Sequence, residues 1–297
     1  MTMNRFLRKT LFRGLLASAT IFLVSAPGQA QTTKDRILAQ KSVTIGIHNR
    51  IPWGYRDASG NVAGLQPAII RAALAPLGVK DIKFVIGEFS TMIPGLLANR
   101  FDMTAAGVAI TPARCASVIF SEPDLTSGDG LLVAAGNPLK IHSFEDIKRN
   151  PKIRLGGGRG SENAKHAVSA GVPADQMHLF QDIESTIAAL VAKRVDAVIM
   201  SAATIVASLQ DPNLKGVERA APFKGLTDAQ GDEVALYTAI AFRPADTDLR
   251  ELYNEQLKKL KDSKELEKII LDTGFTEENF PPKKTAAELC AAAEPKK

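Results

Sequence analysis

Residues 88–123 read EFSTMIPGLLANRFDMTAAGVAITPARCASVIFSEP, and this stretch decides the fold. Apolar side chains at 93–97 have helical spacing. Residues 103–109 then form a run of small and apolar side chains that is typical of a buried strand. The stretch therefore predicts a loop, a short helix, a buried strand and a turn into a second helix.

Arg114 follows a helix-start signal in this stretch. Thr111 is a suitable N-cap, and Pro112 suits the first position of a helix, so Arg114 is placed in the first turn. An arginine beside the free N–H groups of a helix start can hold an anion. From the local pattern alone, a surface ion pair explains Arg114 equally well.

The same stretch resembles a family signature. The segments IPGLLANRFD (93–102), AAGVAITPAR (105–114) and FSEP (120–123) are similar to those of the periplasmic solute-binding proteins of polar amino-acid ABC transporters, family 3. Within that family they most resemble the ectoine/hydroxyectoine-binding branch, which also favours a cysteine after ITPxR. The resemblance extends from Val43 to Cys290. It implies an α/β, two-lobe periplasmic-binding-protein fold (type II), in which each lobe is a mixed sheet flanked by helices and two strands form a hinge.

The first thirty residues have the pattern of a secretory signal peptide. Four basic residues and no acidic residue accompany the apolar run 14–24, and small residues at 25–30 offer a cleavage site. The apolar run is too short to span a bilayer stably, although an N-terminal anchor is the alternative interpretation. With the family resemblance, this pattern predicts a periplasmic location.

The charge and composition exclude some functions. The chain carries 37 basic and 32 acidic residues; without residues 1–30 the basic count is 33, which leaves about +1. The basic residues are scattered and aromatic residues are few, so we expect no nucleic-acid partner. The four histidines are dispersed, and no histidine–cysteine cluster has metal-ligand spacing. We therefore expect neither a metal nor another cofactor.

Cys115 and Cys290 are the only cysteines. In an oxidising compartment such a pair commonly forms a disulfide. Closing so long a loop stabilises a fold by at most ~5 kcal/mol in the chain-entropy model. We predict a Cys115–Cys290 disulfide that ties the polar C-terminal tail, otherwise loosely packed, to the first lobe. A buried thiol with a separate tail thiol is the alternative.

Strand and helix patterns alternate along the rest of the chain. Predicted strands at 42–47 and 81–86 flank a predicted helix at 64–77, an arrangement that favours a parallel-rich α/β sheet. Long strands at 130–135 and 234–242 are expected to join two lobes. The predicted domains are residues 1–30 as signal peptide, 31–133 and 238–297 as lobe 1, and 134–237 as lobe 2.

The resemblance also implies which residues of lobe 1 contact a ligand. Arg114 matches the arginine that grips an α-carboxylate through two hydrogen bonds. Trp53 and Phe89 match aromatic positions that can face a delocalised or cationic group, with core packing as the alternative for the tryptophan. Gly107 and Ala109 match positions whose backbone touches the ligand. Ala109 also stands where the ectoine branch has a third aromatic residue, so the aromatic cage is incomplete.

Charged positions differ from those of the relatives. Arg50 stands where the ectoine branch carries an acidic residue, and Ser201 stands where amino-acid binders carry the aspartate that pairs with the ligand's ammonium. The glycine-rich turn 156–160 fits neither a Walker motif nor a dinucleotide fingerprint. Its N–H groups and the hydroxyl of Ser161 are expected to bind a carboxylate, with Asn163 two residues later. These differences predict a ligand with a carboxylate and little accessible positive charge.

The expected function is that of an extracytoplasmic solute-binding protein of an ABC importer. It would deliver a small polar, carboxylate-bearing solute (an amino-acid derivative or an ectoine-like compatible solute) to a membrane permease, as a monomer without catalytic residues. The alternative is an enzyme similar to the cyclohexadienyl dehydratases on the same fold, which needs a general acid in the cleft. Glu162, Asp182 and Glu184 are the acidic candidates, but carboxylates at helix starts more often pair with the helix dipole. A ligand-sensing partner of a membrane receptor is a third interpretation.

Overall fold

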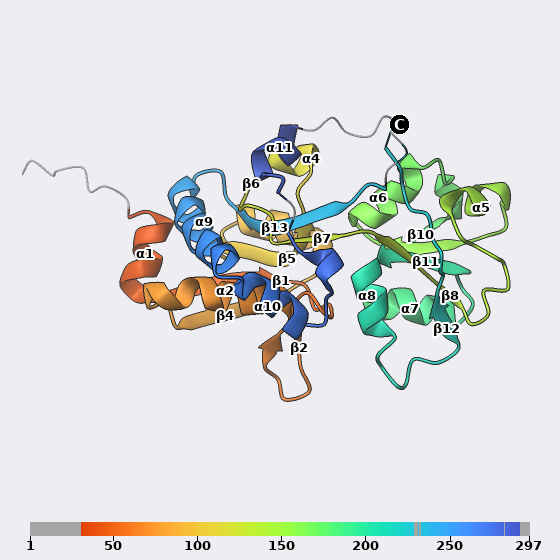
Figure 1. Ribbon diagram of the computed structural model, residues 1–297, viewed down its shortest axis with the longest axis horizontal. Helices are drawn as coiled ribbons and strands as arrows, with labels where there is room; N and C mark the ends of the chain where they lie inside the picture. Colours follow the sequence, from red (N-terminus) through yellow and green to blue (C-terminus); the bar gives the residue numbers. More distant parts are fainter. Residues whose placement is uncertain (1–30, 229–230, 232, 282, 292–297) are drawn as a thin grey trace, which may run out of the picture. The chain divides into compact units, whose positions relative to one another are not determined.

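The computed structural model describes residues 31–228, 231, 233–281 and 283–291, arranged around two larger sheets and a small hairpin (Figure 1). The predicted signal peptide lies outside the described residues. In the part of the chain that is described, no helix is long and apolar enough to cross a membrane.

The first sheet has six strands and is mixed. β1 runs parallel to β4 and β5, whereas β13 runs antiparallel to β5, β6 and β7. In spatial order the strands are β4 (Asp81–Ile86), β1 (Ser42–Ile47), β5 (Met103–Ala109), β13 (Leu236–Phe242) and β6 (Ile119–Phe120), with β7 (Leu125–Ser127) also on β13. Its other elements are α1 (Thr33–Gln40), the hairpin β2 (Tyr55–Arg56) and β3 (Val62–Ala63), α2 (Leu65–Leu74), η1 (Ala75–Leu77), η2 (Phe89–Thr91), α3 (Met92–Leu97), α4 (Pro112–Cys115), α9 (Thr247–Asp262), α10 (Glu265–Asp272), η4 (Glu277–Asn279) and α11 (Ala286–Ala291).

The second sheet has five strands and is also mixed. β9 runs parallel to β10 and β11, and β8 runs antiparallel to β11 and β12. In spatial order the strands are β10 (Met177–Phe180), β9 (Leu155–Gly158), β11 (Ala197–Ser201), β8 (Asp129–Ala134) and β12 (Val217–Arg219). Its helices are α5 (Phe144–Arg149), α6 (Glu162–Ser169), η3 (Ala174–Gln176), α7 (Ile183–Val191) and α8 (Ala202–Ser208).

Each sheet with its own helices forms a lobe, which we call lobe 1 and lobe 2 in chain order. The chain leaves the first sheet after β7 and enters the second at β8, so the crossing lies at Gly128. It returns between Val234, whose N–H still donates to Leu226 O (2.8 Å), and the start of β13. The predicted fold class, α/β with two lobes joined by two strands, is confirmed. The predicted residue boundaries of the lobes stay a prediction, because membership of a sheet does not define which residues move together.

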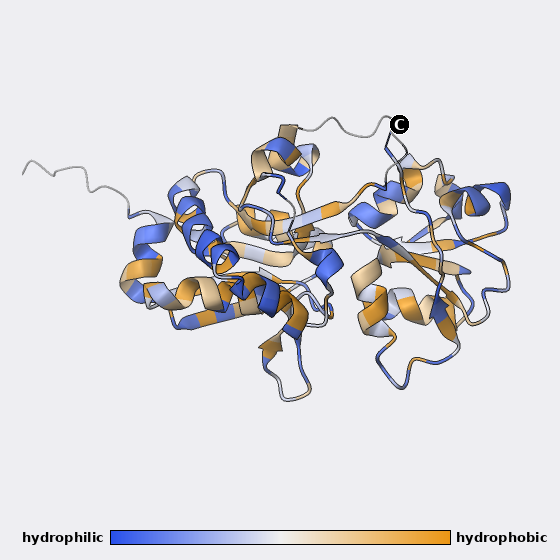
Figure 2. Cartoon of the chain, viewed as in Figure 1, coloured by the Kyte–Doolittle hydropathy of each residue, from blue (hydrophilic) through white to orange (hydrophobic). Residues whose placement is uncertain are grey.

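Alternation along the strands of the first sheet builds a core on both of its faces. In β13, Ile240 and Phe242 pack toward α2, α9 and α10, whereas Ala239 and Ala241 pack toward α3 and α11. Figure 2 shows α9 as a mostly hydrophilic helix. Its hydrophobic residues at core spacing, among them Leu249 and Leu257, are buried.

The C-terminal tail is better packed than its polar composition predicts. Helix α11 forms within it, and Ala286 and Leu289 are buried against the core on the α3 side. Cys290 forms a disulfide with Cys115 of α4, at a Cα–Cα distance of 5.7 Å. The predicted Cys115–Cys290 disulfide is therefore confirmed, and the alternative of two separate thiols is wrong.

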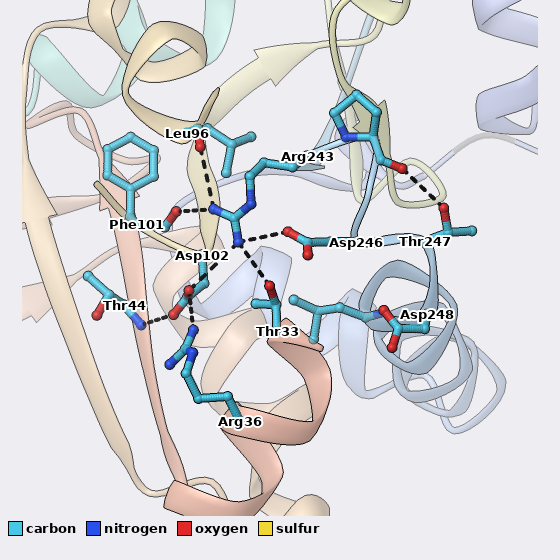
Figure 3. A network of polar contacts seen from close by, with 12 residues as sticks. Thr33, Arg36, Thr44, Leu96, Phe101, Asp102, Arg243, Asp246, Thr247 and Asp248 are labelled. Atoms are coloured by element: carbon cyan, nitrogen blue, oxygen red, sulfur yellow. Dashed lines mark hydrogen bonds and ion pairs between the residues drawn. The ribbon is translucent and has the colours of Figure 1, made fainter. Parts of the chain in front are cut away.

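A network of charges ties α1, the start of β5 and the end of β13 together (Figure 3). Asp102 is 8% exposed, forms an ion pair with Arg36 and accepts a hydrogen bond from Thr44 N (2.9 Å). Arg243 donates to Phe101 O (2.8 Å), pairs with Asp246 (2.7 Å) and lies 3.8 Å from Asp102. Since each buried charge has an opposite charge beside it, these polar groups can be buried where β5 begins and β13 ends.

We predict that Asp102→Asn lowers the free energy of unfolding by about 3 kcal/mol, because it leaves two arginines without their shared carboxylate. Asp262→Asn is the matched control, since Asp262 pairs with Lys258 on the exposed surface of α9. Its effect should stay below about 0.5 kcal/mol. Urea denaturation of both variants measures the difference; equal losses would contradict the role given to the network.

Candidate functional site

One narrow pocket brings together all nine residues that the sequence assigned to ligand binding. Its volume is about 20 Å³, which is room for about one water molecule. Residues of both lobes line it, so it lies where lobe 1 meets lobe 2. The predicted lining residues are Arg50, Trp53, Phe89, Gly107, Ala109, Arg114, Ser161, Asn163 and Ser201, and the structure adds Ser127, Glu162, Leu236 and Thr238.

Arg114 links the two lobes across this pocket. The helix-start signal acts as the sequence predicts: Thr111 is the N-cap of α4, and its hydroxyl accepts from Arg114 N (3.3 Å). The guanidinium donates to Ala109 O (2.9 Å) in lobe 1 and to Gly160 O (3.1 Å) in lobe 2. It also forms an ion pair with Glu162 of lobe 2 (3.1 Å), and both side chains are about nine-tenths buried. The interpretation of Arg114 as a surface ion pair is therefore wrong.

Glu162 also lines the pocket, although its sequence pattern indicated only an acidic candidate near the cleft or a partner of the helix dipole. It is the first residue of α6, and its carboxylate contacts both Arg114 and Lys165 (2.8 Å). The signal that could have found it was its position directly after Ser161, in the turn already assigned to a carboxylate. The pocket therefore contains an acidic group in addition to the cations Arg50 and Arg114.

The turn before α6 is arranged differently from the prediction in one respect. Ser161 N donates to Gly158 O (3.1 Å), so this amide is already used within lobe 2. The Ser161 hydroxyl caps α6 by accepting from Ala164 N (3.2 Å), which leaves its hydrogen to donate into the pocket. Asn163 donates to Asp129 Oδ1 (2.7 Å) at the start of β8, so its amide helps to fix α6 beside the hinge.

Arg50 lies in the loop after β1 and is 9% exposed. Its guanidinium carbon is 5.0 Å from the centre of the Trp53 ring and 5.7 Å from that of Phe89. Nη2 is 3.5 Å from Ala106 O, and Nε has no partner among the described residues. Burial, together with the positive charge of Arg114, lowers the pKa of Arg50 to about 9. Arg50 is therefore a buried cation at neutral pH.

Trp53 packs in the core of lobe 1 and also lines the pocket, so a ligand contact stays a prediction. It is 1% exposed and packs edge-on against Phe275 (5.2 Å between ring centres) in the core of lobe 1. Its Nε1 donates to Thr204 Oγ1 (3.0 Å) on α8 of lobe 2. Ser201 caps α8, and its hydroxyl bonds the same Thr204 oxygen (2.7 Å). Thr204, which no sequence signal singled out, therefore joins two predicted site residues.

Gly107 is held in a backbone conformation with φ +64° that favours glycine. A Cβ at this position would lie 2.5 Å from Arg50 Nη2 and 2.7 Å from the Trp53 ring. Gly107 N donates to Gln66 Oε1 (2.7 Å), and Gln66 Nε2 donates to Asp124 Oδ2 (2.8 Å). Burial raises the pKa of Asp124. The missing side chain thus makes room for Arg50 and Trp53, and a buried network fixes the strand beneath them.

His48 directly follows β1, two residues before Arg50, and is 5% exposed. Its Nδ1 lies 3.1 Å from Gly87 O, and because a carbonyl can only accept, Nδ1 carries the hydrogen. Burial and the charge of Arg50 lower the pKa of His48 to about 4. The ring is therefore neutral at pH 7 and adds no charge to the pocket.

This shift predicts a pH dependence of stability. The unfolded chain protonates His48 near pH 6.5 and the folded protein near pH 4, so the stabilisation is complete above pH 6.5 and is lost as the pH falls to about 4. His48→Gln should reduce the loss of unfolding free energy between pH 7 and pH 4 by roughly 3 kcal/mol. Urea denaturation across this range tests it, with the exposed His178→Gln as control. An unchanged slope in His48→Gln would refute the assignment.

Comparison with known proteins shows the family of this chain. Residues 43–272 match the bacterial extracellular solute-binding proteins, family 3. The probable amino-acid ABC transporter periplasmic-binding protein y4tE of Sinorhizobium fredii is 35% identical over 291 residues, which cover 97% of this chain and 95% of the relative.

Two solved structures are similar to this chain in both fold and sequence. EhuB in complex with hydroxyectoine is 33% identical, with a TM-score of 0.78 over 88% of this chain and 98% of EhuB. The ancestral amino acid-binding protein AncCDT-1, a precursor of cyclohexadienyl dehydratase, is 25% identical, with a TM-score of 0.71 over 82% and 100% of the two chains. This chain belongs to the bacterial extracellular solute-binding proteins, family 3.

Proposed function

We propose that this protein captures a small polar solute with a carboxylate group between its lobes and delivers it to the permease of an ABC importer. The observation that carries the proposal is the Arg114–Glu162 contact. Arg114 already binds a carboxylate in the pocket, and that carboxylate stands in for the acidic group of a solute. Family membership and the name of the Sinorhizobium fredii relative support the transport role.

Solute entry requires the lobes to separate. A volume of about 20 Å³ cannot hold an amino-acid-sized molecule, because contacts between the lobes fill the pocket. The chain crosses between the lobes only twice among the described residues, at Gly128 and between Val234 and β13, which is the geometry of a hinge. We propose residues 31–133 and 238–297 as one moving unit and 134–237 as the other. A solute that contacts both units stabilises the closed state.

The charges of the pocket select the solute. Arg50 and Arg114 bring two positive charges and Glu162 brings one negative charge, so a solute with net negative charge balances the pocket. Ser201 offers no counter-charge to an ammonium group of the solute, but the carboxylate of Glu162 can pair with such a group. A dibasic amino acid such as lysine still fits poorly, since its second ammonium would face Arg50.

The proposed setting is the periplasm, with the protein acting as a monomer and with a membrane permease rather than nucleic acid as its partner. The name of the Sinorhizobium fredii relative supports this location. Turnover by a dehydratase-like mechanism is the weaker proposal. The carboxylate of Glu162 contacts Arg114 and Lys165, an arrangement that suits charge pairing rather than proton donation.

A thermal-shift screen of organic acids, amino acids, opines and ectoines should find carboxylate solutes that stabilise the protein. Arg114→Gln should weaken their binding about 100-fold, since charge-assisted hydrogen bonds are worth up to about 3 kcal/mol. Arg159→Gln, an exposed arginine on the neighbouring turn, should leave binding unchanged. The fluorescence of Trp53, the only tryptophan, reports binding. Equal affinity in Arg114→Gln would rule out the proposed site.

Glu162→Gln tests whether the internal carboxylate competes with the solute. For an acid without an amino group, the variant should bind about tenfold more tightly, a gain of about 1.4 kcal/mol, because Arg114 no longer has to leave an ionic partner. Glu145→Gln, an exposed glutamate on α5, is the control. Weaker binding of such an acid by Glu162→Gln would show that Glu162 helps to hold the solute instead of competing with it.

A further inference from the structure

Arg50 is a buried cation that lacks an acidic partner in the described part of the chain. Among the described residues, no carboxylate lies within ion-pair distance of its guanidinium and Nε has no partner, while the guanidinium's hydrogen bond to Ala106 O is 3.5 Å long. The charged group that acts on it most is another cation, Arg114. A buried charge without a partner is costly, so an anion that reaches Arg50 gains a strong interaction.

The two arginines share one pocket and one aromatic ring. The guanidinium carbon of Arg50 lies 5.7 Å from the centre of the Phe89 ring, and that of Arg114 lies 5.6 Å from it. Glu162 pairs with Arg114 but not with Arg50. Two cations beside one aromatic ring, of which only Arg114 has a carboxylate partner, form a receptor for a molecule with more than one acidic group.

We infer that the solute is a dicarboxylate, with one acidic group bound by Arg114 and the other by Arg50. The inference rests on the proposed function and names its class of solute. An amino group, where the solute has one, faces Glu162, so an acidic amino acid or an amino acid with a carboxylate-bearing substituent satisfies all three charges. A cationic ligand would need an acidic residue at position 50, whereas this chain has Arg50 there.

A second cavity gives such a solute room. It has a volume of about 730 Å³ and lies between the loop after β1 and the helices α7 and α8 of lobe 2. Among the described residues, Arg50 is the only one that lines both cavities. Ile183, Ile187 and Val191 of α7 form an apolar part of its lining, which also includes the carboxylates of Glu184 and Asp211. A solute whose second acidic group meets Arg50 can therefore extend a substituent past it onto an apolar wall.

The experiment compares diacids with their monoamides, which keep the shape and remove one charge. L-Glutamate and L-glutamine, L-aspartate and L-asparagine, and succinate and succinamate are titrated into the full mature protein by calorimetry. The same pairs are measured with Arg50→Gln, with Arg50→Lys, which keeps the charge, and with the exposed Arg56→Gln as control. We expect at least one diacid to bind tenfold or more tightly than its monoamide. Arg50→Gln should abolish this preference, Arg50→Lys should keep part of it, and Arg56→Gln should keep all of it.

Other outcomes overturn the inference, and they separate it from the proposed function. If monoamides or other monocarboxylates bind as tightly as the diacids, or if Arg50→Gln keeps the diacid preference, Arg50 only packs between Trp53 and Phe89. Binding of a carboxylate through Arg114 then stands. If no diacid binds at all, the inference is also wrong. If no carboxylate of the panel or of the wider solute screen binds, the proposed function fails with it.

Discussion

The structure depends on how two guanidinium groups are kept charged and close together out of water. Arg50 and Arg114 repel each other, and burial makes both charges costly, as the lowered pKa of each shows. Glu162 offsets one charge, and the aromatic faces of Phe89 and Trp53 cover the guanidinium of Arg50. The balance is incomplete by one charge. A pocket built in this way is suited to an anionic solute. Without a solute, the ion pair between Arg114 and Glu162 connects the two lobes.

The scaffold around the pocket fixes these groups from several directions. Gly107 leaves room for Arg50. Gln66 accepts a hydrogen bond from Gly107 N and donates one to Asp124, and this buried pair of hydrogen bonds fixes β5, the strand that contains Gly107. The Cys115–Cys290 disulfide joins α11 to α4, the short helix that contains Arg114. Rigid support matters because an arginine that must bind in a fork loses its advantage when its backbone moves.

Much of this could be predicted from the sequence, because the decisive signals are local or belong to the family. The N-cap and proline before Arg114 predicted its place in the first turn of a helix, and the family resemblance named nine residues that all line one pocket. The disulfide was predicted from an even pair of cysteines in a chain whose first thirty residues have the pattern of a signal peptide. In each case a short pattern determines the geometry without help from distant residues.

The parts that could not be predicted depend on contacts across the fold. Thr204 contacts Trp53 only because α8 packs against lobe 1, and no sequence pattern indicates this contact. The position of Glu162 after Ser161 indicates that it lies near the pocket, but not that it pairs with Arg114. Helix α11 was missed because its few apolar residues are buried by packing on the α3 side, not by a periodic stripe.

The most direct test is a crystal structure of the mature protein with the carboxylate solute that stabilises it most. We expect an acidic group of the solute within hydrogen-bond distance of the Arg114 guanidinium and the Ser161 hydroxyl, with Glu162 turned away from Arg114. A solute bound elsewhere, with the Arg114–Glu162 contact intact, would contradict it.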